Sequence, residues 1–99
     1  MVRIAVDRDR IAEFCRRNHI RRLAFFGSVL RDDFRADSDV DVLVEFEPGM
    51  KVGLRFFAME RELADILGRK VDLNTPGFLS EEILKDALTE AEILYVAAG

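Results

Sequence analysis

The sequence predicts an α+β fold in which a mixed β-sheet carries its helices on one face. Three observations lead to this prediction. Helix-like and strand-like patterns alternate along the chain, the strand-like segments are short, and no segment repeats another. Such alternation is typical of small α/β and α+β sheets. A chain of 99 residues has room for one domain, which we expect to span residues 1–99.

Composition and charge indicate an ordinary globular protein. Hydrophobic residues make up 49% and charged residues 34% of the chain, a balance unlike that of disordered chains. The formal net charge of -4 argues against direct nucleic-acid binding, because proteins that bind nucleic acid usually carry a basic excess. The single cysteine cannot form an internal disulfide, and neither a signal-peptide pattern nor an apolar run of about 18 residues occurs. We therefore expect a cytoplasmic protein without a membrane span.

The first predicted element is a helix near the N-terminus. Asp7 or Asp9 is suited to cap its start. Phe14 and Cys15 lie on its apolar face at helical spacing, so we expect both side chains to be buried. His19, the only histidine, is expected to be exposed or to cap the end of this helix.

Two strands are predicted next, separated by a polar segment. Residues 23–26 form an apolar run without alternation that stops at Gly27, which is typical of a strand covered on both faces. A short helical turn after Ser28 and a loop lead to the second strand, Asp39–Phe46. With a period of two, one face of this strand is apolar and the other carries its acidic side chains.

The last third of the chain predicts two helices and two short strands. The first helix covers residues 53–67 with Gly68 as its C-terminal cap, and a strand follows at residues 70–74. Ser80 is suited to cap the second helix, and residues 92–96 form a strand at a sheet edge. The apolar side chains expected in the core are Phe56, Phe57, Met59, Leu63, Ile66 and Leu67 of the first helix and Ile83, Leu84, Ala87 and Leu88 of the second.

Three aspartates form a candidate metal site on this predicted sheet. Asp39 and Asp41 are two residues apart on one strand, so their side chains point the same way with Cα atoms about 6.6 Å apart. Asp72, on a matching face of a neighbouring strand about 4.8 Å away, can complete the set. Three carboxylates of this kind can hold two Mg²⁺ ions for an in-line displacement at phosphorus.

A candidate phosphate-binding turn precedes these aspartates. Gly27 ends a buried strand, where the lack of a side chain lets the backbone approach a phosphate group. Ser28 begins a helical turn and offers its hydroxyl and nearby backbone N–H groups. Arg31 and Arg35 lie close enough in sequence to add positive charge. Neither a P-loop nor a dinucleotide-binding glycine pattern occurs.

These residues resemble a known family. Gly27-Ser28, ten residues and then Asp39-Val-Asp41 match the GS-x10-D-x-D signature of the DNA polymerase β-like nucleotidyltransferases. The sequence around the signature is similar to that of the minimal nucleotidyltransferases, or MNT proteins, which are encoded beside HEPN-domain partners. The segments that carry this similarity are Phe26-Gly-Ser-Val-Leu-Arg31, Asp37-Ser-Asp-Val-Asp-Val-Leu-Val-Glu-Phe46, and Gly68-Arg-Lys-Val-Asp-Leu73 followed by Thr75-Pro76.

The resemblance implies a fold, an activity and a role for each residue. The fold is the minimal palm-like core of the family, and the activity is transfer of AMP from ATP to a tyrosine of a HEPN toxin, which makes the protein an antitoxin. By this resemblance Asp39 and Asp41 bind Mg²⁺, Asp72 helps to bind metal and activates the attacking hydroxyl, and Gly27 and Ser28 hold the triphosphate. The cofactor is Mg²⁺, with two ions expected, and the partners are ATP and the toxin.

Other interpretations of the same residues stay open. The domain can act as a non-catalytic binding module that neutralises its partner by complex formation, with an idle acidic site. The segment Asp39-Val-Asp-Val42 also matches a phosphatase-type nucleophile motif, although phosphatase folds need a larger sheet than this chain can build. Taken alone, a D-x-D pair is most often a solvated strand end. Tyr95, the only tyrosine, belongs to the last predicted strand, where we expect its side chain to be packed. Modification of Tyr95 itself is a minor alternative.

Overall fold

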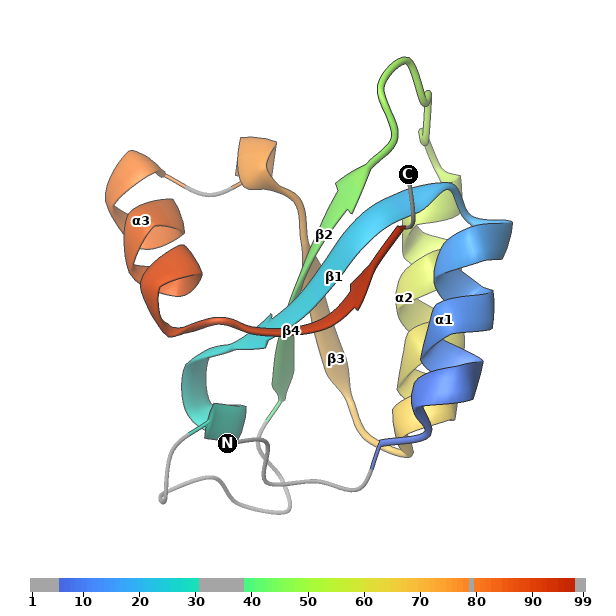
Figure 1. Ribbon diagram of the computed structural model, residues 1–99, viewed down its shortest axis with the longest axis horizontal. Coiled ribbons are helices and arrows are strands. Elements are labelled where there is room, and N and C mark those ends of the chain that lie inside the picture. Colours follow the sequence, from blue (N-terminus) through green and yellow to red (C-terminus); the bar gives the residue numbers. More distant parts are fainter. Residues whose placement is uncertain (1–5, 31–38, 79, 98–99) are drawn as a thin grey trace.

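The computed structural model describes residues 6–30, 39–78 and 80–97, and it confirms the α+β fold (Figure 1). Every predicted helix and strand is present within one or a few residues of its expected place. The elements follow one another as α1 (Arg8–Arg17), β1 (Ile20–Phe26), the 3₁₀ turn η1 (Gly27–Leu30), β2 (Val40–Phe46), α2 (Arg55–Leu67), β3 (Val71–Asn74), the 3₁₀ turn η2 (Pro76–Phe78), α3 (Glu81–Glu90) and β4 (Glu92–Val96).

Local signals in the sequence place the helix ends. The Asp7 side chain caps α1 by accepting a hydrogen bond of 3.2 Å from the backbone N–H of Arg10. Gly68 ends α2 in the left-handed conformation, with φ of 66°. His19 follows α1 with φ of 56° and an exposed side chain, as expected for a residue at a helix end.

The four strands form one mixed sheet in the order β3-β2-β1-β4. β1 pairs antiparallel with β2 and with β4, whereas β2 and β3 run parallel. The parallel pair needs a crossover, which α2 supplies. In that pair Asp41 lies opposite Asp72, so the two acidic strands are in register.

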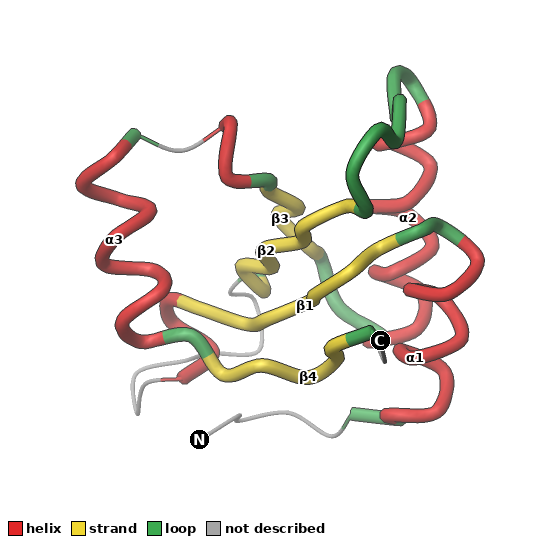
Figure 2. Tube along the Cα trace, turned by 45° about the horizontal axis from the view of Figure 1, so that its top comes forward, coloured by secondary structure: helices red, strands yellow, loops and turns green. Residues whose placement is uncertain are grey.

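The helices α1 and α2 pack on one face of the sheet and enclose the hydrophobic core (Figure 2). Phe14 of α1 and Leu63 of α2 are fully buried there against Val42 and its neighbours on β2. Burial also raises the pKa of the Cys15 thiol to about 12, which keeps the group neutral. This packed face corresponds to the apolar face predicted for β2.

The third helix departs from the expectation that all helices lie on one face. Figure 1 shows α3 on the opposite side of the sheet from α1 and α2. There Ala24 of β1 and Leu43 of β2 are buried and line a groove with Leu88 and Ala91. The apolar run in β1 explains this arrangement, because a strand without alternation needs cover on both faces.

Two apolar residues expected in the core are exposed instead. Phe57 of α2 and Leu88 of α3 have exposed fractions of 61% and 51%. Each lies at the edge of the apolar face of its helix. Helical periodicity alone does not distinguish a buried position from an exposed position at that edge. Among the described residues, no helix is long and apolar enough to cross a membrane.

Candidate active site

The strands β2 and β3 place two of the predicted aspartates side by side. Asp41 and Asp72 are register partners in the parallel pair, and the backbone N–H of Val40 donates to the carbonyl oxygen of Lys70 at 2.9 Å where that pairing begins. Both aspartates alternate with buried residues on their strands, so their side chains leave the sheet on the face opposite α1 and α2. Asp72 is exposed and Asp41 is half-buried, which leaves both within reach of a ligand from solvent.

Gly27 lies directly against the Asp41 carboxylate. A Cβ atom added to Gly27 would overlap Asp41 Oδ2 and lie 3.2 Å from Asp41 Cγ. Gly27 also has φ of 74°, a left-handed conformation that side chains other than glycine rarely adopt. Only glycine therefore allows the end of β1 to approach the carboxylate so closely.

The third predicted aspartate, Asp39, lies apart from the strand pairing that holds the other two. Asp39 comes directly before β2 and is exposed. Among the described residues, no group of three Asp, Glu, His or Cys side chains lies close enough together to hold a metal ion. Asp39 therefore does not complete the three-carboxylate cluster that the sequence predicts with Asp41 and Asp72. Carboxylates brought together repel one another, which opposes such a cluster in the protein alone.

The predicted phosphate-binding residues are only partly described. Ser28 lies in η1, directly after Gly27, as the predicted helical turn requires. Arg31 and Arg35 lie outside the described residues. The geometry at Gly27 thus brings the start of the turn to Asp41, and the roles of the two arginines stay a prediction.

A cross-strand ion pair that the sequence did not predict lies on the same face of the sheet. Arg22 of β1 lies opposite Glu45 of β2 and donates a hydrogen bond to its carboxylate, and Arg21 approaches the same group at 3.4 Å. This hydrogen bond is the main reason that the pKa of Glu45 lies below its ordinary value. The pair closes one end of the groove of about 280 Å³ under α3. Only the strand register could have revealed it.

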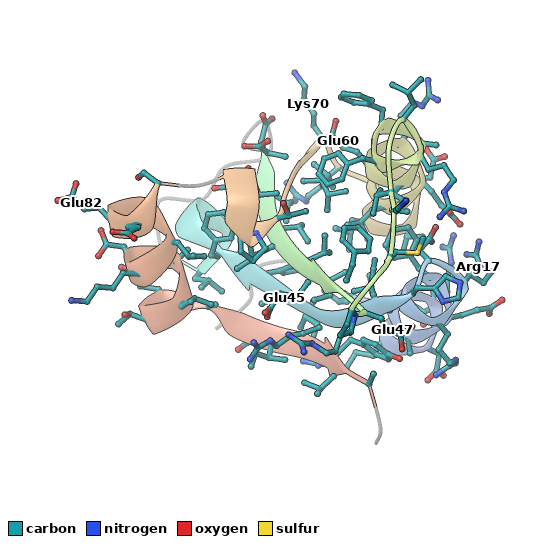
Figure 3. The ribbon with its side chains drawn as sticks, turned by 90° about the horizontal axis from the view of Figure 1, so that it is seen from above. Arg17, Glu45, Glu47, Glu60, Lys70 and Glu82 are labelled. Atoms are coloured by element: carbon teal, nitrogen blue, oxygen red, sulfur yellow. The ribbon has the colours of Figure 1, made fainter. Side chains whose placement is uncertain are left out.

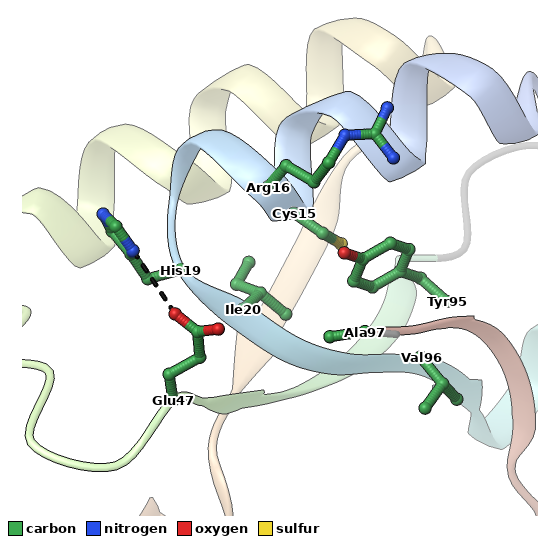
Figure 4. Close-up of a pocket in the computed structure, with 8 residues that line it drawn as sticks. All are labelled: Cys15, Arg16, His19, Ile20, Glu47, Tyr95, Val96 and Ala97. Carbon is green, nitrogen blue, oxygen red and sulfur yellow. Dashed lines mark ion pairs between the residues drawn. The ribbon is translucent and has the colours of Figure 1, made fainter. Parts of the chain in front are cut away.

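A larger hollow of about 480 Å³ lies elsewhere, at the end of α1 (Figure 4). It contains the ion pair between His19 and Glu47, whose Nδ1 and Oε2 atoms are 3.4 Å apart, and the Tyr95 ring beside Cys15. None of its lining residues belongs to the acidic site. The buried neutral thiol and an exposed ion pair give this hollow no evident chemistry.

Comparisons with known proteins identify the family of this chain. A family model described as "Nucleotidyltransferase domain" matches residues 8–94. The protein adenylyltransferase MntA of Thermococcus cleftensis is 39% identical over 77 residues, which cover 78% of this chain and 75% of that protein. A chain of a solved toxin–antitoxin complex with AMP-PNP has a TM-score of 0.75 at 20% identity, covering 93% of this chain and 75% of its own.

A further structural neighbour comes from Shewanella oneidensis. It belongs to a complex of a tri-AMPylated HEPN toxin with an MNT antitoxin, and its TM-score is 0.66 at 20% identity. The match covers 91% of this chain and 70% of that one. At this identity the two solved structures establish a shared fold.

Proposed function

Because this chain belongs to the nucleotidyltransferase domain family, we propose that it transfers AMP from ATP to a protein hydroxyl. The acceptor in this proposal is a tyrosine of a HEPN-domain toxin, and the chain acts as its antitoxin. The adenylyltransferase name of a relative 39% identical to this chain supports the reaction. The toxin–antitoxin complexes among its structural neighbours support the choice of partner and of ATP, since one of them holds AMP-PNP. We also propose that the protein acts in the cytoplasm, where ATP is available.

The observation that carries the proposal is the pair of aspartates beside Gly27. Asp41 and Asp72 lie in register on parallel strands, and the start of η1 approaches Asp41 at a position that only glycine can occupy. A nucleotidyltransferase needs oxygen ligands for a cation next to a place for the triphosphate. The register of Asp41 with Asp72 supports the first requirement, and the close approach of Gly27 to Asp41 supports the second.

The donor atoms of this site fit magnesium. Mg²⁺ prefers oxygen ligands and takes one or two protein carboxylates together with phosphate oxygens. Asp41 and Asp72 would hold the metal, with Asp39 joining them from the start of β2, and two ions are the proposed number. When bound, Mg²⁺ offsets the negative charge of the triphosphate and of the developing transition state.

The residues of the chain then position the reactants. Gly27 and Ser28 hold the triphosphate through the turn that begins at the end of β1, and Arg31 and Arg35 add positive charge. The acceptor oxygen forms a bond to the α-phosphorus while the bond from that phosphorus to the bridging oxygen breaks, and pyrophosphate leaves. Asp72, the more exposed carboxylate of the pair, accepts the proton of the acceptor hydroxyl.

Intact mass spectrometry of the partner tests this proposal. A HEPN-domain protein from the neighbouring gene, if one is encoded there, is incubated with the chain, ATP and Mg²⁺, in parallel with the Asp41→Asn and Asp39→Asn variants. We expect the partner to gain one or more AMP units with the unaltered chain. The variants should lower the transfer rate by about a thousandfold, which corresponds to roughly 4 kcal/mol of transition-state stabilisation. Asp86→Asn on the exposed surface of α3 is the matched control and should transfer AMP at the normal rate.

The same experiment separates the proposal from a binding module. A partner that is neutralised in a stable complex without any gain in mass would contradict AMP transfer and favour binding alone. Transfer that survives in both variants would show that these carboxylates are not the metal ligands.

A further inference from the structure

The strand that carries Asp72 is an outer strand of the sheet. β3 pairs with β2 along one side only. The backbone groups along the other side of such a strand have no strand partner, so its position is less constrained than that of a central strand. β3 is also only four residues long. A residue that holds the outer side of β3 would therefore control where the Asp72 carboxylate lies.

Glu60 of α2 holds that outer side. Its Oε2 atom accepts a hydrogen bond of 2.9 Å from the backbone N–H of Leu73, and the bond is partly buried. Figure 3 shows Glu60 between α2 and the start of β3 near Lys70. A charged acceptor makes a stronger bond to an N–H group than a neutral one.

This hydrogen bond acts on the peptide unit that follows Asp72. The N–H of Leu73 and the carbonyl of Asp72 belong to one planar peptide, so fixing the N–H direction fixes the whole plane. The Asp72 carbonyl oxygen also accepts a hydrogen bond of 3.1 Å from Asn74 Nδ2. The two bonds hold the peptide at both ends and restrict the backbone angle that aims the Asp72 side chain.

The contact reaches the acidic site only through the backbone. The Leu73 side chain is buried with α2, with 3% of its surface exposed, and the side chain of Asp72 leaves the strand on the opposite face. We infer that Glu60 is a positioning residue that keeps the Asp72 carboxylate in register with Asp41. This inference rests on the proposed function. It assigns Glu60 a role in the reaction although Glu60 does not touch the reactants.

The same helix offers a matched control. Glu62 lies two residues further along α2 and pairs with Arg17 of α1, with a distance of 2.6 Å between Oε2 and Nη2. This ion pair joins α2 to α1, whereas the hydrogen bond of Glu60 joins α2 to β3. Replacing Glu62 thus removes a glutamate contact of α2 without changing the support of Asp72.

The experiment compares Glu60→Ala, Glu60→Gln and Glu62→Ala in the full chain. The rate of AMP transfer is measured against Mg²⁺ concentration at saturating ATP. Mg²⁺ binding without ATP is followed by NMR at the Asp72 amide, together with hydrogen exchange of the Leu73 amide. Removing a group that supports a metal ligand usually lowers metal affinity or activity by 10- to 100-fold, so we expect Glu60→Ala to raise the half-saturating Mg²⁺ concentration by about tenfold. Its Leu73 amide should also exchange faster.

The remaining variants decide between positioning and general stabilisation. Glu60→Gln keeps an acceptor oxygen and should stay within about threefold of the unaltered chain in Mg²⁺ dependence. Glu62→Ala should leave the Mg²⁺ dependence unchanged. Equal Mg²⁺ dependence in Glu60→Ala and Glu62→Ala would overturn the inference, as would a Glu60→Gln variant as impaired as Glu60→Ala. An unaltered chain that transfers no AMP would remove the proposed function and the inference together, whereas the other outcomes leave the function standing.

Discussion

The two faces of the sheet are built on different principles. The face under α1 and α2 is closed by apolar side chains from these helices and from the sheet, and residues such as Phe14, Val42 and Leu63 have no exposed surface. The opposite face is covered in part by α3, and it also carries Asp41 and Asp72. The packed face supplies most of the stability, because buried apolar area is the main favourable contribution to folding.

This difference implies that stability and activity can be changed separately. A substitution on the packed face should lower the free energy of unfolding and leave the activity of the folded molecules unchanged. A substitution beside the aspartates should lower activity more than stability. Stability measured in urea and AMP transfer per folded molecule are the two quantities that test this separation.

The largest effect on stability is expected for Leu63→Ala on the packed face. The Leu63 side chain is fully buried in the core, so its truncation leaves a cavity and should cost about 2–5 kcal/mol of unfolding free energy. Leu54→Ala is the control, since Leu54 precedes α2 and is 85% exposed; its effect should stay within about 0.5 kcal/mol. Equal losses in urea unfolding for the two variants would contradict the assignment of the packed face as the stable one.

Gly27→Ala is expected to lower AMP transfer strongly while it lowers the free energy of unfolding only modestly. The left-handed backbone would cost about 1–2 kcal/mol of stability, and the added Cβ would push the Asp41 carboxylate away from its place. We expect AMP transfer per folded molecule to fall at least tenfold, in line with small displacements at reacting groups.

Gly68→Ala is the control for Gly27→Ala. Gly68 also has a left-handed backbone, with φ of 66°, but an added Cβ would meet no atom within 4 Å. This variant should lose stability to a similar extent and transfer AMP at the normal rate per folded molecule. A matching loss of activity in both variants would show that backbone strain, and not the contact with Asp41, explains the result.

The smallest expected effect concerns the pH dependence of stability at Glu45. Because Arg22 lowers the pKa of the folded Glu45 carboxyl, the pair stabilises the protein above the unfolded pKa near 4.3 and loses this contribution as pH falls through the lower folded value. The Arg22 side chain is 40% exposed and therefore screened, so we expect less than about 1 kcal/mol. Unfolding in urea at pH 7 and pH 3 should show that Glu45→Gln loses more stability, relative to the unaltered chain, at pH 7 than at pH 3.

Glu13→Gln serves as the control for this pH effect. Its carboxylate is 68% exposed and lies 3.9 Å from Arg17 on the same helix. We expect this variant to show a smaller difference between pH 7 and pH 3 than Glu45→Gln. A stability difference for Glu45→Gln that is equal at pH 3 and pH 7 would mean that packing, and not charge, explains the contribution of this residue.

The sequence by itself determined the local structure of this protein and indicated which aspartates are candidate metal ligands. Asp7 caps α1, Gly68 ends α2, and the strand patterns gave β2 and β3 nearly to the residue. These features depend on neighbouring residues and on backbone preferences, which a short stretch of sequence contains. The Gly-Ser and D-x-D motifs were also visible, because their spacing lies within one stretch of chain.

Only the tertiary structure decided which distant segments meet. The contact of Gly27 with Asp41, the register of Asp41 with Asp72, and the hydrogen bond from Leu73 to Glu60 each join separate elements. The position of α3 on the second face was predicted wrongly, because the apolar run in β1 indicates cover on both faces without specifying which helix supplies it. Such contacts depend on strand order and on how each crossover closes, and no local pattern specifies either of them.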